Sequence, residues 1–282
     1  PAGGVATPSG TVDRVASPTR DHLDHARDFL SKLDPALVTA TREIPGAVAV
    51  VYAVLIGRDP EVRARQLRIL DASAAPVLRQ ETRKMLAALG RAPEAARLPL
   101  MDLAVPSLRR LSAGQFQELY ANVGALSEAD NRIDLFELAL KRALLDRVAP
   151  LFGVHRAPEI RFTRLPAMAT GVSALLSGLA HAGHPDSADH ARRAFEAGRA
   201  ALGSGAEGVK LLPSGACTVA VLARALDEAS KAAPALKAKI LAAGTASVTW
   251  DRRVTMEEAE LLRALGYALG CPTPPFIPGV EI

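Results

Sequence analysis

The sequence predicts an all-α protein, a multi-helix array built from two related helical halves. Much of the 49% hydrophobic content is Ala and Leu, and aromatic residues account for only 4%. Ala and Leu favour helices because they lose little rotamer freedom there, and the β-branched and aromatic excess typical of strands is missing. Apolar residues also recur at i, i+3, i+4 and i+7, and one helix–loop–helix motif occurs twice. Both patterns indicate packed amphipathic helices.

Four segments follow one another along the chain. Residues 1–16 are rich in Gly, Pro, Ser, Thr and Ala, which predicts a linker. The first helical half is expected at 17–155 and the second, which ends in the repeated motif, at 156–270. Residues 271–282 form a Pro-rich tail, which should be extended because proline cannot continue a helix.

Several helix starts are marked by a side chain that caps the first turn. They are Ser17, Asp59, Ser112, Asp186 or Ser187, and Ser214. Apolar stripes at helical spacing run through 191–202 and 236–247. The most apolar runs, 46–57 and 167–182, are shorter than the ~20 residues that a membrane span needs. We therefore expect both runs to be buried core helices, with no direct membrane span.

The charge and cysteine content argue against several classes of function. The net charge is only +4, from 34 basic and 30 acidic residues that alternate along most of the expected helices. Without a basic cluster, and with few aromatic residues for base stacking, we expect no nucleic-acid partner. The two cysteines, Cys217 and Cys271, form no CxxC pair. This spacing indicates neither a zinc knuckle nor a redox pair.

The repeated motif reads DNRIDLFE at 130–137 and DRRVTMEE at 251–258, an offset of 251 − 130 = 121. As a metal loop of the EF-hand kind, its first copy would use four carboxylates, Glu128, Asp130, Asp134 and Glu137. Leu126 stands where that loop needs its first ligand, and the second copy has fewer carboxylates still.

As a pair of helix caps, the motif fits both copies. Thr255 with Glu258 and Asp134 with Glu137 have the spacing of capping boxes, and Asp251 can close the turn before the second box. We favour capping over a metal site, and both interpretations stay open at this point.

Known catalytic motifs are missing from the sequence. The pairs His22/His25 and His181/His184 are each three residues apart, but zinc needs further ligands in fixed places. The chain contains no HExxH, GxSxG or GxxxxGK[ST], and the glycine-rich run GSGAEG at 203–208 is interpreted as a flexible surface loop. We therefore expect this chain not to be an enzyme, and to have neither a catalytic residue nor a cofactor of its own.

Residues 251–272 resemble the end of a TerB-like helical module. The wider chain, through its motifs at 50–55, 58–67, 97–104 and 180–184, resembles the long C-terminal region of bacterial membrane zinc metallopeptidases of the HtpX and CAAX-protease type. This resemblance covers most of residues 17–275. Asn131 and Arg252 stand where the TerB-like module usually has glycine, which weakens any inference of metal binding from it.

The resemblance implies a non-catalytic accessory module, used for regulation or protein interaction, in a membrane-bound zinc metalloendopeptidase. The zinc would belong to an HExxH domain that is not in this chain. Expected partners are that membrane-embedded catalytic domain and a protein partner or protease substrate. The expected place is a soluble domain at the cytoplasmic face of the bacterial inner membrane. Two alternatives stay open, a stand-alone helical protein-binding scaffold and a weak cation-binding sensor of the TerB type.

Overall fold

The computed structural model describes residues 32–93, 96–129, 135–153 and 159–271. These residues form twelve α-helices and no strand, so the predicted all-α fold class is confirmed. An isolated parallel bridge joins Phe162 to Ala232. Contacts divide the chain into two compact units, one within Leu23–Arg156 and one formed mainly by Ala157–Ile282. The predicted boundary between the helical halves, at 155/156, lies outside the described residues.

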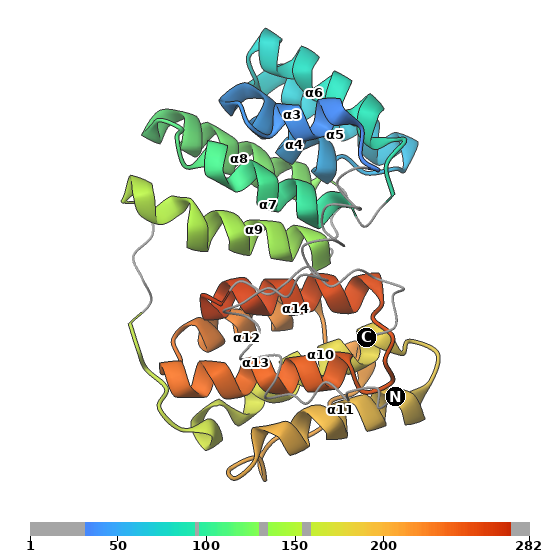
Figure 1. The fold of residues 1–282 in the computed structure, drawn as a ribbon, viewed down its shortest axis with the longest axis vertical. Coiled ribbons are helices and arrows are strands. Elements are labelled where there is room, and N and C mark those ends of the chain that lie inside the picture. The colour runs from blue at the N-terminus through green and yellow to red at the C-terminus, as the bar shows by residue number, and fades with distance from the viewer. Residues whose placement is uncertain (1–31, 94–95, 130–134, 154–158, 272–282) are drawn as a thin grey trace, which may run out of the picture. The chain divides into compact units, whose positions relative to one another are not determined.

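The first unit is a bundle of seven described α-helices and one short 3-10 helix (Figure 1). Their bounds are α3 Pro35–Ala40, α4 Ile44–Leu55, α5 Pro60–Ser73, α6 Pro76–Leu89, α7 Arg97–Leu108, α8 Ala113–Glu128, α9 Leu135–Arg147 and η2 Ala149–Phe152. Proline stands in the first turn of α3, α4, α5 and α6. The amides of a first turn have no partner within the helix, so proline costs no hydrogen bond there.

Helix α4 is the core of the first unit. Every residue from Gly46 to Leu55 is buried, and α4 packs on α3, α6, α7 and α8. A Cβ at Gly46 would collide with the backbone of Ala40, so the α3–α4 contact requires glycine there. The one polar group along this stretch, the Tyr52 hydroxyl, accepts a hydrogen bond from Asn122 Nδ2 at 2.9 Å. The expected burial of the run 46–57 is confirmed for this helix.

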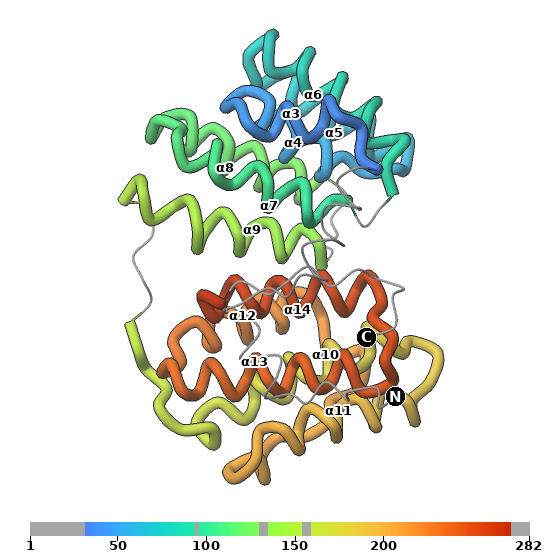
Figure 2. The backbone as a smooth tube through the Cα atoms, in the orientation of Figure 1, coloured from blue at the N-terminus to red at the C-terminus, as the bar shows by residue number. Residues whose placement is uncertain are grey.

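The second unit holds the other five α-helices and two 3-10 helices, traced in Figure 2. Their bounds are η3 Leu165–Met168, α10 Ala169–Gly183, α11 Ala188–Leu202, η4 Ser214–Ala216, α12 Val219–Ser230, α13 Pro234–Val248 and α14 Met256–Leu269. Helix α10 is central, because it packs on α11, α12, α13 and α14. The stripes predicted at 191–202 and 236–247 face the interior of this unit.

Leu165–Gly183 is the one stretch of the described helices that is long and apolar enough to cross a membrane, and 67% of its most apolar window is buried in the protein.

Three polar side chains, four residues apart on α10, form hydrogen bonds with the backbone of the segment that follows α11. Ser173 Oγ and Ser177 Oγ accept from the amides of Lys210 and Leu212, each at 2.9 Å. His181 Nε2 lies 2.8 Å from the Leu212 carbonyl oxygen. Helix α10 is therefore a buried core helix, as expected for the run 167–182.

Most of the predicted helix starts that can be examined are N-caps. Asp59, Ser112 and Ser187 accept hydrogen bonds from first-turn amides of α5, α8 and α11. The start predicted at Ser214 is wrong, because Ser214–Ala216 is a 3-10 turn and α12 begins at Val219. Thr218, which directly precedes the apolar stripe of α12, caps it instead. Ser17, the linker 1–16 and the tail after Cys271 lie outside the described residues.

Candidate functional site

The second copy of the repeated motif is a helix cap. Thr255 Oγ1 accepts from the Glu258 amide at 3.2 Å, and Glu258 Oε2 accepts from the Thr255 amide at 2.8 Å. Asp251 Oδ1 closes the preceding turn by accepting from the Arg253 amide at 2.9 Å. The capping prediction is therefore confirmed for this copy. Arg252 takes the left-handed conformation, with φ of 66°, at the position where the resembling module has glycine.

The first copy is described only in part. Asp130 and Asp134 lie outside the described residues, so neither the cap predicted there nor the metal loop can be examined. Helices α9 and α14 begin at Leu135 and Met256, and 256 − 135 = 121 reproduces the offset of the repeat. Glu128 is the last residue of α8 and is exposed, whereas Glu137 is buried in the first turn of α9.

Metal-ligand sets are missing from the described residues, where no group of three or more His, Cys, Asp or Glu side chains could hold an ion. In the second copy of the motif, the carboxyl group of Glu258 accepts hydrogen bonds from the amide and the hydroxyl of Thr255. The sequence also lacks the HExxH motif that would bind the zinc implied by the resemblance. The described residues do not fit that metal.

Glu258 is a buried carboxyl group, 1% exposed, at the start of α14. Burial raises its pKa from 4.5 to about 7, against the opposing effect of the hydrogen bonds from the Thr255 amide and hydroxyl. The carboxyl group lies against Gly183 at the end of α10, where a Cβ would collide with it. The cap of α14 is thus also a tertiary contact with α10.

The paired histidines His181 and His184 contact different groups and do not form a metal site together. His184 Nε2 accepts from Trp250 Nε1 at 2.8 Å, whereas His181 contacts Leu212, as described above. The ring of His184 also meets that of His190 edge-on, with 5.7 Å between centroids. Burial lowers the pKa of His184, and His190 lowers it further, against the raising effect of Asp251. The rings of His184, His190 and Trp250 thus form a cluster where the C-terminal ends of α10 and α13 meet the first turn of α11. His22 and His25 lie outside the described residues.

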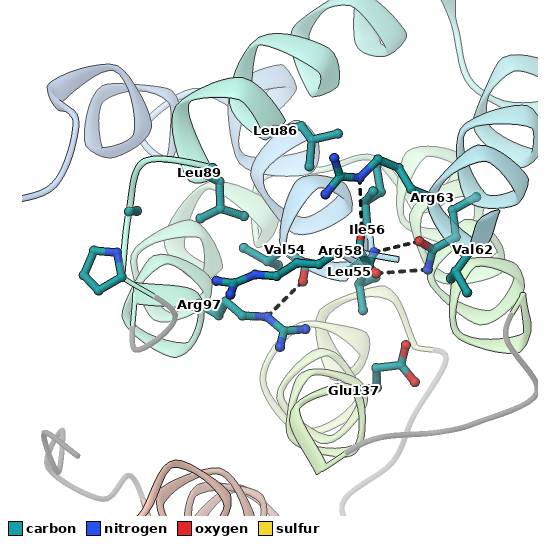
Figure 3. A pocket seen from close by; sticks show the side chains of 15 residues that line it. Val54, Leu55, Ile56, Arg58, Val62, Arg63, Leu86, Leu89, Arg97 and Glu137 are labelled. Atoms are coloured by element: carbon teal, nitrogen blue, oxygen red, sulfur yellow. Dashed lines mark hydrogen bonds between the residues drawn. The ribbon is translucent and has the colours of Figure 1, made fainter. Parts of the chain in front are cut away.

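A pocket of about 320 Å³ opens beside the C-terminal end of α4 in the first unit (Figure 3). Three arginines line it: Arg58 from the α4–α5 turn, Arg63 from α5 and Arg97 from the first turn of α7. Glu137 of α9 supplies the one carboxyl group among the lining residues. Arg58 is exposed, and Arg63 and Arg97 are half-buried. Arginine side chains therefore outnumber carboxyl groups among the residues that line this pocket.

The pocket wall is held by hydrogen bonds to carbonyl groups in the last turn of α4, which lack helical partners, and in the turn that follows it. Arg97 Nε donates to the Val54 oxygen at 3.1 Å, and Arg63 Nε donates to the Gly57 oxygen at 3.0 Å. Gln66 Nε2 donates to the Leu55 oxygen at 3.0 Å, and its Oε1 accepts from the Gly57 amide at 2.8 Å. The dashed lines in Figure 3 mark these bonds, which lie at the last turn of α4 and the residues that follow it.

A second contact fixes the guanidinium of Arg97, whose Cζ lies 3.9 Å from the ring centroid of Phe136. The remaining wall is largely apolar. Its larger members are Val54, Leu55, Ile56, Val62, Leu86 and Leu89. Planar guanidinium groups beside an apolar wall can bind a carboxylate or phosphate that is attached to a hydrophobic group.

Sequence reasoning did not identify this pocket. Its arginines stand in two of the motifs that carry the family resemblance, 58–67 and 97–104, but no charge cluster marks them along the chain. Arg58 and Arg97 are 97 − 58 = 39 residues apart, and they meet because α5 and α7 both begin near the end of α4. The only local signal is the repetition of Arg before and after the Asp59 cap.

Comparison with known proteins gives no match to any protein-family model, curated protein or solved structure.

Proposed function

We propose that this chain is a non-catalytic helical module that binds a partner protein, and that it is the accessory C-terminal region of a membrane-bound zinc metalloendopeptidase. The observation that carries the binding role is the pocket lined by Arg58, Arg63 and Arg97. The accessory role rests on the resemblance of most of residues 17–275 to such proteins. Both roles agree with an all-α chain that contains no HExxH.

The proposed mechanism is recruitment. The arginine pocket holds an acidic group of the partner, which keeps that protein near a catalytic domain embedded in the membrane. The partner is the protease substrate or a regulator of the protease. The module would work at the cytoplasmic face of the bacterial inner membrane, with zinc confined to the catalytic domain. Rigid arginines suit this role, because side chains ordered before binding lose less entropy when the partner arrives.

The accessory role is tested by reading the complete coding sequence around this chain. An HExxH motif flanked by apolar spans of about 20 residues is expected in the same open reading frame. An open reading frame without that motif overturns the accessory role and leaves the stand-alone protein-binding scaffold as the function.

The recruitment role is tested in the complete protein with R63Q. Cleavage of the native protein substrate should become about tenfold less efficient, mainly through a higher KM, because a charged hydrogen bond is lost. Cleavage of a short unstructured peptide, which needs no recruitment, should stay unchanged. The matched control is R65Q, since Arg65 is an exposed residue of the same helix outside the pocket. Equal effects of R63Q and R65Q would refute recruitment through this pocket.

A further inference from the structure

We infer that the arginine pocket recognises one acidic side chain of a partner peptide together with an aliphatic side chain next to it. This inference rests on the proposed protein-binding function and names the chemistry of the group that is bound. It follows from the size of the pocket, the arrangement of its guanidinium groups, the capped N-terminus of α5 and the apolar wall.

The size of the pocket limits what fills it. Its volume of about 320 Å³ is at the lower end of the range for small-molecule sites, which is about 300–1,000 Å³. A nucleotide or a large cofactor would need more enclosed space. One or two side chains of a peptide would fill a hollow of this size.

The charge of the pocket selects an anion. Guanidinium groups stay protonated at any physiological pH, and they bind a carboxylate through two parallel hydrogen bonds. Arg97 donates Nε to the Val54 carbonyl group in the last turn of α4, and Arg63 donates Nε to the Gly57 carbonyl group in the turn after it. These bonds fix the plane of each guanidinium before any ligand arrives. Their terminal nitrogens lie around one hollow, together with the exposed Arg58 (Figure 3).

The carboxyl group of Glu137, which lines the pocket, favours a carboxylate over a phosphate, because a singly charged ligand meets less repulsion beside it than a phosphate dianion. Phosphates also bind at helix N-termini, through the unpaired first amides. At this pocket the N-terminus of α5 is closed, because Asp59 Oδ1 accepts from the Glu61 amide at 2.9 Å and the Val62 amide at 3.0 Å. The N-terminus of α7, whose first residue is Arg97, has no side-chain cap, so inorganic phosphate is the competing ligand to be tested.

The apolar wall accounts for the aliphatic neighbour. Val62, Leu86 and Leu89 are half-buried and line the same hollow as the arginines. A ligand made only of a charged group, such as free phosphate, would leave these side chains in water. An aliphatic side chain beside the acidic one would cover them and gain the free energy of apolar burial.

The test is a titration of the full chain with a capped pentapeptide, acetyl-Ala-Leu-Glu-Leu-Ala-amide, followed by the NMR signals of the arginine Nε–H groups. We expect saturable shifts of the Arg63 and Arg97 signals. Binding should be about tenfold weaker for the same peptide with Gln in place of Glu, and about tenfold weaker for R63Q. The R65Q control should bind like the unchanged chain. Raising the salt concentration should weaken binding, because the charges are partly exposed.

A second variant, R58Q, guards against misfolding, since Arg58 is exposed in the turn before α5, and the melting temperature of each variant is measured beside its binding. Weaker peptide binding by folded R58Q supports the inference. It is overturned if the Glu and Gln peptides bind equally, or if R63Q and R58Q bind the Glu peptide as well as R65Q does.

Inorganic phosphate is titrated as the competing probe. Phosphate that binds more tightly than the peptide, and loses affinity in R63Q, overturns the carboxylate assignment. That result leaves recruitment to be decided by the cleavage experiment above. Conversely, unchanged cleavage by R63Q in the complete protein, with Arg63-dependent peptide binding in this chain, refutes recruitment and upholds the ligand assignment.

Discussion

The capping carboxyl group Glu258 gives the sharpest quantitative prediction. Its pKa is raised by burial from 4.5 to about 7 in the folded protein, whereas in the unfolded chain it titrates near the ordinary value. A group whose folded pKa is raised stabilises the fold fully below the unfolded pKa. That stabilisation is lost as the pH rises through the folded pKa. The window is therefore about pH 4.5 to 7, and the difference in pKa corresponds to about 3 kcal/mol as an upper limit.

The perturbation is E258Q. Glutamine is also accepted in a capping box, so its side-chain oxygen can still receive the Thr255 amide without burying a charge. We expect E258Q and the unchanged protein to be about equally stable near pH 4.5. Between pH 4.5 and 7 the advantage of E258Q should grow, and above pH 7.5 it should level off at about 2–3 kcal/mol.

The assay is urea unfolding of both proteins at half-unit pH steps from 4.5 to 8.5. Subtracting the two curves cancels the other titrating groups, including His184, whose lowered pKa acts in the opposite direction as the pH falls. The matched control is E257Q, because Glu257 is the exposed neighbour in the same turn. A stability difference between E258Q and the unchanged protein that does not vary with pH would refute the reasoning, as would an equal effect of E257Q.

Three further predictions concern the two copies of the repeated motif. Thr255→Ala should destabilise the fold by about 1 kcal/mol and Thr255→Ser by much less, measured by urea unfolding, because only the first change removes the cap. Arg252→Gly should raise stability by up to about 1 kcal/mol in the same assay, because a side chain with φ of 66° is strained where glycine is not; a loss of stability would contradict this. Millimolar calcium should leave the melting temperature unchanged if the first copy is only a cap, whereas a saturable rise that Glu137→Gln abolishes would establish the metal site instead.

Local interactions were readable from the sequence alone. The Ala and Leu content and the apolar stripes determine an all-α fold, because helix propensity and amphipathic spacing act within a few residues. The caps at Asp59, Ser112 and Thr255 were predictable for the same reason, since each side chain binds an amide two or three residues away. For α11 the sequence left Asp186 and Ser187 as alternatives, and the structure has Ser187 as the cap. Ser214 shows the limit of this approach, because Thr218 offered an equivalent hydroxyl closer to the stripe.

The raised pKa of Glu258 in the capping box could be derived only from the tertiary structure. The sequence gives Thr255 and Glu258 their spacing but not the burial of the carboxyl group. That burial arises where α14 meets Gly183, which is 258 − 183 = 75 residues earlier in the chain. The raised pKa of Glu258 follows from this contact. A capping box on an exposed helix would leave its glutamate near the ordinary value.

The arginine pocket likewise exists only in the folded chain. Arg58, Arg63 and Arg97 look like ordinary solvated charges in the sequence, since opposite charges surround them. Packing of α4 against α7, and the turn that leads into α5, bring the three guanidinium groups to the buried end of one apolar helix. Carbonyl groups of Val54, in the last turn of that helix, and of Gly57, in the turn after it, then orient Arg97 and Arg63. Sequence patterns record short-range preferences, whereas a site made by residues 39 apart, counted as 97 − 58, depends on how the helices pack.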